Sequence, residues 1–285
     1  MQILAATDFS TRSNRALRQA GLLAQRGNAQ LYIVHVVDDD RPEEFVRSEK
    51  REAERLLSEQ TNSMPELKNI QPHAKVIVGD PFDGILKVAA EVNADLVVMG
   101  SHRKQLLDVI VGTTLERVLR KGSYPVLMVN NEAQRKYETV LAPVDIVEAS
   151  IRAVEVAAKL SLIGDRPPTL LHAFTPIAKG KLSLNGADQA SIASYVANER
   201  QQVLNELVGL LSDTLARLPG RPSLRVDEGE AMELISRAVS EMRPDLLVMG
   251  TNGRSALVSL LIGSVTEAAL RTLNVDILAV PPTTR

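Results

Sequence analysis

The chain has 285 residues, of which 45% are apolar and 24% charged, a composition typical of soluble globular proteins and a length sufficient for two domains. Its net charge of −2 creates no general attraction to nucleic acid or to anionic membranes, so neither is expected as a main partner. The absence of cysteine excludes disulfides, thiolate metal sites and a cysteine nucleophile.

The first half of the chain alternates short apolar runs, which predict strands, with amphipathic stretches, which predict helices. Strands are predicted at Ile3 to Ala6, Gln30 to Val37, His73 to Val78, Leu96 to Met99 and Val126 to Val129. Helices are predicted at Ser10 to Gln25, Glu43 to Gln60, Phe82 to Val92 and Thr114 to Arg120. The second of these helices has a narrow apolar stripe that includes Phe45, so we expect it in an outer, solvated layer. Strands joined by helical crossovers indicate a parallel sheet with helices on both faces.

The second half begins near Tyr137 and repeats this order of elements. Strands are predicted at Val140 to Val144, Thr169 to Phe174, Leu224 to Val226, Leu246 to Met249 and Ile277 to Val280, and helices at Glu148 to Leu162, Met232 to Met242 and Val265 to Thr272. Thr175 to Ala187 is predicted as an irregular loop before a long helix that reaches Leu218. The apolar stripe of that helix indicates packing on its own domain or against another subunit, so a homodimer is one alternative.

The sequence contains an internal repeat, with two similar copies offset by about 150 residues. Asp95-Leu-Val-Val-Met-Gly100 recurs as Asp245-Leu-Leu-Val-Met-Gly250, and Gly112-Thr113 returns as Gly263-Ser264. The polar stretch between the copies is short. The sequence therefore predicts two tandem domains, residues 1–130 and 137–285, that pack side by side.

The most informative stretch of the second copy runs from Asp245 to Thr272. A buried strand ends at Gly250, Gly253 follows, and Gly263-Ser264 stands where a helix begins, which gives the spacing G-x2-G-x9-G-S. Glycines let backbone amides approach a ligand closely, and the first amides of a helix are unpaired and lie at the positive end of its dipole. Arg254 is the only formal charge between Asp245 and Glu267. This pattern is typical of an anion site, although ordinary loop glycines and a solvated arginine are the alternative.

This spacing resembles the ATP-binding loop of the universal stress protein family (UspA-like), and the likeness covers nearly the whole chain. The resemblance implies two doubly wound, Rossmann-like α/β domains, each a five-stranded parallel sheet of order 3-2-1-4-5, joined as an intramolecular pseudo-dimer through Val126 to Val129 and Ile277 to Val280. It implies Asp145 on the adenine and ribose side, and phosphates held by the backbone amides of Gly250, Gly253 and Gly263 and by the Ser264 hydroxyl. The residues that it implies at the border of the site are Thr251, Asn252, Arg254 and Val265. The implied ligand is ATP, which Mg²⁺ can accompany.

The first half departs from this pattern. Arg103 stands where the second half has Gly253, and Asp108 adds a negative charge to the loop. A non-glycine residue in a left-handed conformation costs about 1–2 kcal/mol, or about tenfold in affinity. We therefore expect nucleotide in the second domain, and weak binding or none in the first.

Three functions remain as hypotheses: a cytoplasmic stress-response module that binds ATP and hydrolyses it slowly at most, a genuine ATPase or nucleotide-dependent transferase, and a scaffold without a ligand. A Gly-x-Ser-x-Gly elbow, a Walker loop and a dinucleotide G-x-G-x-x-G are all missing. His35, His73, His102 and His172 lack metal-ligand spacing, so no metal site is predicted, and His35 and His172 are expected to be structural. The first ten residues do not resemble a signal peptide, and no apolar run is long enough to cross a bilayer, so we expect a cytoplasmic location.

Overall fold

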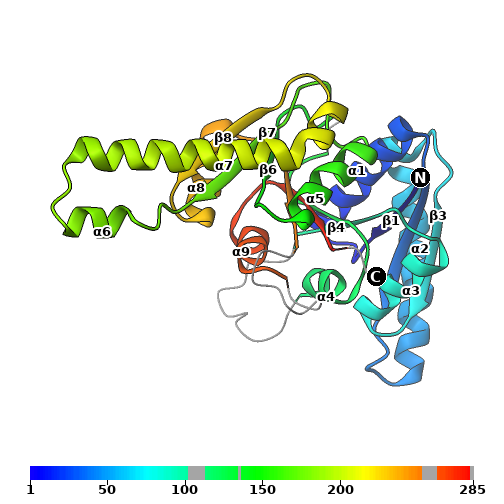
Figure 1. Cartoon of the computed structure of the whole chain (residues 1–285). Coiled ribbons are helices and arrows are strands. Elements are labelled where there is room, and N and C mark those ends of the chain that lie inside the picture. The colour runs from blue at the N-terminus through cyan, green and yellow to red at the C-terminus, as the bar shows by residue number, and fades with distance from the viewer. Residues whose placement is uncertain (102–112, 134–135, 252–261, 283–285) are drawn as a thin grey trace.

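The computed structural model describes residues 1–101, 113–133, 136–251 and 262–282. Its strands form one 10-stranded sheet of order β3-β2-β1-β4-β5-β10-β9-β6-β7-β8 (Figure 1). The first half contributes β1 Gln2–Ala6, β2 Gln30–Val37, β3 His73–Val78, β4 Leu96–Gly100 and β5 Val126–Val129. The second half contributes β6 Val140–Pro143, β7 Thr169–Phe174, β8 Ser223–Glu228, β9 Leu246–Gly250 and β10 Asp276–Val280. Each half therefore has the predicted order 3-2-1-4-5.

The two halves join through the antiparallel pair of β5 and β10. Val126 pairs with Ala279, Leu127 with Leu278 and Met128 with Ile277. The other neighbouring strands pair in parallel. This seam confirms the predicted pseudo-dimer, and it pairs two strand edges that would otherwise be open to aggregation.

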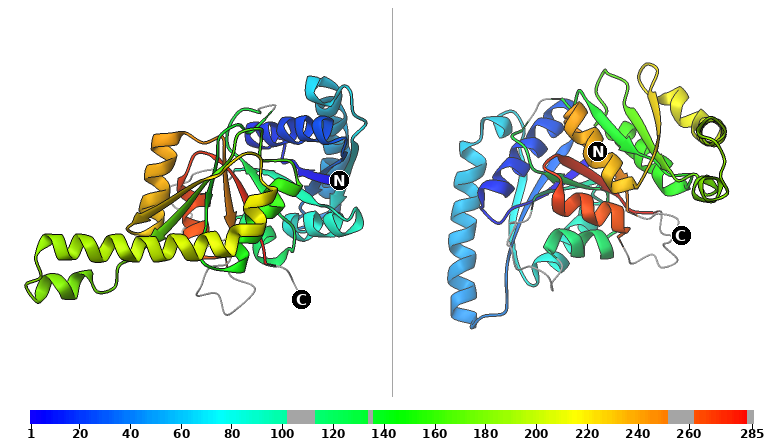
Figure 2. Two further views of the ribbon diagram at one scale, coloured as in Figure 1. Left: turned by 45° about the horizontal axis from the view of Figure 1, so that its top comes forward. Right: turned by 90° about the vertical axis from the view of Figure 1, so that its left-hand side faces the viewer.

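The helices lie in two layers, one on each face of the sheet (Figures 1 and 2). One face is covered by α1 Thr11–Gly27, α2 Glu43–Ser63, α5 Glu148–Lys159 and α7 Gln189–Arg217. The other is covered by α3 Pro81–Glu91, α4 Thr114–Lys121, α8 Ala231–Met242 and α9 Ser264–Thr272. A short 3-10 turn, Pro65–Leu67, follows α2. Successive residues of the central strands face opposite layers, so β9 places Leu246 and Val248 in one core and Leu247 and Met249 in the other.

The aspartate that opens each repeated motif fastens the start of one strand to its neighbour. Asp95 Oδ2 accepts a hydrogen bond from Gln2 N at 2.8 Å. Asp245 Oδ2 accepts hydrogen bonds from Glu138 N and Thr139 N, both at 2.9 Å. These contacts hold β4 beside β1 and β9 beside β6 at the amino ends of the strands.

Two local predictions were wrong. Thr175 to Ala187 is not irregular throughout, because it contains α6, Lys179–Leu184. Gly186, at φ +78°, follows this helix, and Ala178 N donates to the Tyr195 hydroxyl of α7 at 3.2 Å, so α6 is built against α7. In α2 the buried residues are Val46, Ala53 and Leu57, whereas Phe45 is 66% exposed.

The long helix α7 extends beyond the sheet, and α6 lies alongside its amino-terminal end (Figure 1). Only the carboxyl-terminal half of α7 supplies buried residues, namely Leu207, Leu211 and Thr214. The predicted apolar stripe is thus buried on its own domain for about half its length.

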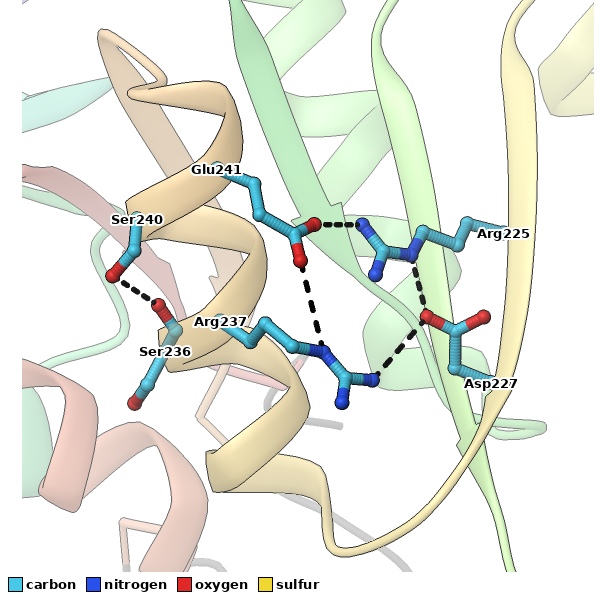
Figure 3. A network of polar contacts seen from close by, with 6 residues as sticks. All are labelled: Arg225, Asp227, Ser236, Arg237, Ser240 and Glu241. Atoms are coloured by element: carbon cyan, nitrogen blue, oxygen red, sulfur yellow. Dashed lines mark hydrogen bonds and ion pairs between the residues drawn. The ribbon is translucent and has the colours of Figure 1, made fainter.

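The outer strand β8 is covered by charged side chains that connect it to α8 (Figure 3). Arg225 donates to Glu241 at 2.8 Å and lies beside Asp227, and Arg237 lies 3.9 Å from both acids. A charged edge of this kind discourages pairing with another chain.

Candidate functional site

A cavity of about 360 Å³ lies at the carboxyl ends of β6 and β9, a size within the usual range of small-molecule sites. These are the two strands at which the order of the second half reverses, and ligands of doubly wound sheets gather at such a point. We call it the second-half cavity. It is lined by Pro143, Val144, Asp145, Ser150, Leu171, His172, Ala173, Ala231, Ile235, Met249, Gly250, Gly263, Ser264, Val265 and Thr266.

Helix α9 begins at this cavity without a side-chain cap. Its N-cap is Gly263, which has no side chain to accept from the first amides of the helix. Unpaired amides at the positive end of a helix dipole attract anions. The first turn of α9, Ser264 to Thr266, is therefore the part of the cavity best suited to a phosphate.

Two hydrogen bonds hold the end of β9 against the start of α9, and a third joins that end to β10. Gly263 N donates to Thr251 O at 2.5 Å, and Thr266 Oγ1 donates to Gly250 O at 2.7 Å. Thr251 N in turn donates to Val280 O of β10 at 2.9 Å. The Gly263 N–H is already bonded to Thr251 O, so it is not available to a phosphate, contrary to what the resemblance implies. Gly263 instead fixes the position of the amides that follow it in the first turn of α9.

The opposite wall is formed where β6 and β7 end. Asp145 lines the cavity, and its Oδ1 accepts from Ile146 N at 2.8 Å. His172 is buried, and its Nδ1 lies 2.8 Å from Val144 O. The histidine therefore connects the neighbouring strands β7 and β6, which agrees with the structural role predicted for it.

The structure brings five of the predicted site residues to the second-half cavity: Asp145, Gly250, Gly263, Ser264 and Val265. Thr251 is buried and does not line it. Asn252, Gly253 and Arg254 lie outside the described residues. Reasoning from the sequence did not include the apolar wall, Ile235, Met249 and Leu171. The alternation of β7 and β9 is the signal that would have placed the last two on one face of the sheet.

A model of the universal stress protein family matches residues 1–130 and again residues 136–281. The chain belongs to the universal stress protein family. A universal stress protein of Mycobacterium tuberculosis is 22% identical over 97% of this chain and 95% of its own length. One from Methanocaldococcus jannaschii is 27% identical over 46% of this chain and 95% of its own length.

Solved structures show the same architecture. The crystal structure of a universal stress protein from Archaeoglobus fulgidus aligns with a TM-score of 0.68 at 19% identity and covers 98% of each chain. A putative universal stress protein from Pseudomonas aeruginosa aligns with a TM-score of 0.59 at 19% identity, over 98% of this chain and 92% of its own. The two family domains of this chain share one sheet.

The first half of this universal stress protein has a cavity of its own, of about 340 Å³, at the carboxyl ends of β1 and β4. We call it the first-half cavity. His35 repeats the role of His172, with its Nδ1 2.8 Å from Thr7 O. Desolvation alone would raise the pKa of Asp8 at this cavity, but hydrogen bonds from Ser10 and Ser13 hold it below its ordinary value.

The amino terminus of α4, at the first-half cavity, is capped by side chains. Thr113, the N-cap of α4, accepts from Glu116 N, and Glu116 in turn accepts from Thr113 N, both at 3.2 Å. This reciprocal capping box uses two of the amides that an anion would need. The two halves thus differ at the same place in the fold. Arg103 and Asp108, which distinguish them in sequence, lie outside the described residues.

Within the described ranges, no group of three or more acidic, histidine or cysteine residues is arranged to hold a metal ion. The helices of those ranges include none that is both long and apolar enough to cross a membrane.

Proposed function

We propose that the second half of this universal stress protein binds ATP in the second-half cavity, and that the nucleotide sets the conformation or the choice of partner in a stress response. Asp145 would lie on the adenine and ribose side. Gly250, Gly253, Gly263 and Ser264 would form the phosphate side, bordered by Thr251, Asn252, Arg254 and Val265. ATP is an intracellular metabolite, so the proposal includes a cytoplasmic location.

The observation that carries this proposal is the uncapped start of α9 at the second-half cavity. Hydrogen bonds to a charged group contribute about 1.5–3 kcal/mol each. Micromolar affinity requires about 8 kcal/mol, so three or four amide contacts together with a buried adenine are sufficient. The apolar side chains of Ile235 and Met249 offer a surface for that ring.

Mg²⁺ prefers oxygen ligands, and it would enter with the triphosphate. The Ser264 hydroxyl, on the phosphate side of the cavity, fits that preference. Hydrolysis is proposed to be slow at most, because Glu267, in the first turn of α9, is paired with Arg271 at 2.8 Å and is a poor candidate for a general base. Single-turnover assays with and without Mg²⁺ test this. A rate of about one per second would instead establish an ATPase.

In the first half, the capping box of α4 supports weak binding of ATP or none. The test is calorimetric titration of ATP into the protein and into Gly253→Arg, which copies the residue of the first half onto the second. We expect about a tenfold loss of affinity, and the reciprocal Arg103→Gly should leave the affinity of the second half unchanged. Equal affinities of the protein and Gly253→Arg would contradict the assignment.

A further inference from the structure

A groove of about 570 Å³ runs along residues 189–204 in the amino-terminal half of α7. Lys179 of α6 and Glu228 of β8 complete its lining. This half of the helix is the part that extends beyond the sheet (Figures 1 and 2). The groove shares no lining residue with either cavity, so it is a separate feature of the molecule. We call it the α7 groove.

The α7 groove continues the face by which this helix packs on its own domain. Residues three, four and seven apart lie on one face of an α-helix. Ile192, Val196 and Leu204 share such a face and line the groove. The face continues into Leu207 and Leu211, which are buried in the core beneath the carboxyl-terminal half of α7. The amino-terminal half thus presents the same apolar face as an open groove, an arrangement typical of sites that bind another helix.

Arg200 lies in the middle of this apolar face, one helical turn from both Val196 and Leu204. Among the described residues, no hydrogen bond or ion pair engages its guanidinium. The other long outer helix, α2, instead pairs its charges along its own length, as in the ion pair of Arg47 and Glu43. Helix α2 is therefore suited to face water, whereas α7 holds an unpaired cation among apolar side chains.

A second copy of this chain, docked by the same face about a two-fold axis, would not complement the groove. It would bring an identical lining, in which Glu228 supplies the one carboxylate among the described residues, and that carboxylate already accepts from Lys179 at 2.6 Å. Arg200 would then be buried without an acid, which is costly, whereas a free carboxylate can form a charge-assisted, bidentate pair with it. The charge of the groove therefore favours a different helix, one with a carboxylate in its apolar face.

We propose that the α7 groove binds an amphipathic helix of another protein, and that a Glu or Asp side chain in the apolar face of that helix pairs with Arg200. Residues 189–204 span about 24 Å at 1.5 Å per residue, so a partner helix of about four turns fills the groove. Residues 38–42 join β2 to α2 without a counterpart of α6, so the hairpin of α6 and α7 belongs to the second half alone. The proposal does not depend on ATP, because the groove lies outside the second-half cavity.

A displayed library of helical peptides of about four turns tests the chemistry of the partner. Each peptide has a fixed stripe of leucines, and the positions within and beside the stripe vary among Glu, Gln and Lys. Selection on the purified protein, without ATP, should enrich Glu over Lys, and selection on Arg200→Glu should enrich Lys over Glu. The proposal is overturned if the two selections show the same charge preference or none.

The selected peptide, labelled with a fluorophore, is then titrated with each variant and followed by fluorescence anisotropy. Arg200→Gln should weaken binding by about tenfold or more, because it removes a charge-assisted pair, and replacing the selected Glu of the peptide by Gln should weaken it equally. Arg217→Gln changes the last turn of the same helix, outside the groove lining, and should leave the affinity unchanged.

Ala197→Gln tests the groove itself. Ala197 is exposed and lines the groove, so the longer side chain fills the groove without entering the core, and it should abolish peptide binding. Unchanged binding by Ala197→Gln, or dissociation constants above about 1 mM for every selected peptide, would overturn the proposal. Sedimentation velocity decides against a second copy: a dimer that Ala197→Gln dissociates would show that the groove binds another copy of this chain instead.

Discussion

Arg271 of α9 donates from Nε to Oε1 of Glu116 in α4 at 2.9 Å, and the Glu116 side chain is only 3% exposed. Through its other oxygen the same carboxylate caps α4 at Thr113 N. Glu116 corresponds to Glu267 in the repeat, and Arg120 to Arg271, and Arg120 lies 3.5 Å from Glu267. Each half thus pairs its glutamate with the arginine of the other half, beside the two cavities, where α4 and α9 are neighbours (Figure 1).

The two ion pairs differ in burial, so breaking each of them should lower the free energy of unfolding by a different amount. Arg271→Ala leaves the buried Glu116 charge with fewer partners, and we expect the free energy of unfolding to fall by about 1–3 kcal/mol. Arg120→Ala is the matched control. Its partner Glu267 is 28% exposed, and a loss of about 0–1 kcal/mol is expected.

Urea denaturation of Arg271→Ala, Glu116→Gln and the double variant measures the coupling energy of the pair. The double variant should recover part of the loss seen in Arg271→Ala, because it removes the stranded charge. If the effects of the two single substitutions simply add, Glu116 is stabilised by its cap alone.

The strands of the sheet were predictable because the sequence patterns that indicate them are local. The bounds of β2, β3, β5 and β7 agree with those predicted, since each is an apolar or β-branched run bounded by turn or polar residues. The duplication then predicted that the halves match, and the resemblance supplied the strand order and the β5–β10 seam. The cavity-lining positions Asp145 and Gly250 followed from the same two sources.

The difference between the two helix starts was not predictable from the sequence. Both halves carry the capping pattern, as Thr113-x-x-Glu116 and Ser264-x-x-Glu267. Only the first forms a capping box, whereas α9 begins one residue earlier, with Gly263 as its N-cap. The Glu267 carboxylate pairs with Arg271 and Arg120, and the second of these is far away in the chain. The local sequence of α9 does not show that Arg120, from the other half, competes with the helix start for the Glu267 carboxylate.

Gly263→Ser should install the missing cap on α9. Gly263 has φ −60° and ψ 143°, close to the φ −61° and ψ 160° of Thr113, so a serine there can accept from an amide of the first turn without strain. Without nucleotide, the free energy of unfolding should rise by a few tenths of a kcal/mol. ATP affinity, measured by calorimetry, should fall by about tenfold, because one phosphate-binding amide is occupied.

The reverse change in the first half, Thr113→Ala, should cost about 1 kcal/mol of stability and leave ATP affinity unchanged. Unaltered ATP binding by Gly263→Ser would mean that the amides of α9 are not phosphate ligands.

Tyr137, at the start of the second half, should make the protein less stable at alkaline pH. Its hydroxyl donates to Asp276 Oδ2 at 2.8 Å, and burial, followed by the charge of Asp276, raises the pKa of Tyr137 well above its usual value of 10.0. Above about pH 10 the unfolded chain loses this proton while the folded one keeps it. The free energy of unfolding should therefore fall by up to about 1.4 kcal/mol per pH unit from this residue.

Tyr137→Phe should be less stable at neutral pH, because it loses the hydrogen bond to Asp276, but its stability should decline less steeply above pH 10. Tyr124→Phe is the control for tyrosine substitution in general. Denaturation series between pH 8 and pH 11 measure both slopes, and equal slopes for the protein and Tyr137→Phe would show that Tyr137 ionises while the protein is still folded.

Substitution by alanine should have opposite effects on the stability of the protein at Gly100 and at Gly209. A Cβ at Gly100 would lie 2.7 Å from the backbone of Arg12 and Ser13, and two rigid main chains must separate to admit it. Gly209 is exposed within α7 and would meet no atom within 4 Å, so alanine there only increases helix propensity. Gly100→Ala should destabilise by about 1–3 kcal/mol, and Gly209→Ala should stabilise by about 0.5–1 kcal/mol. Thermal and urea denaturation of both variants measure this. A neutral Gly100→Ala would show that α1 can move away from β4.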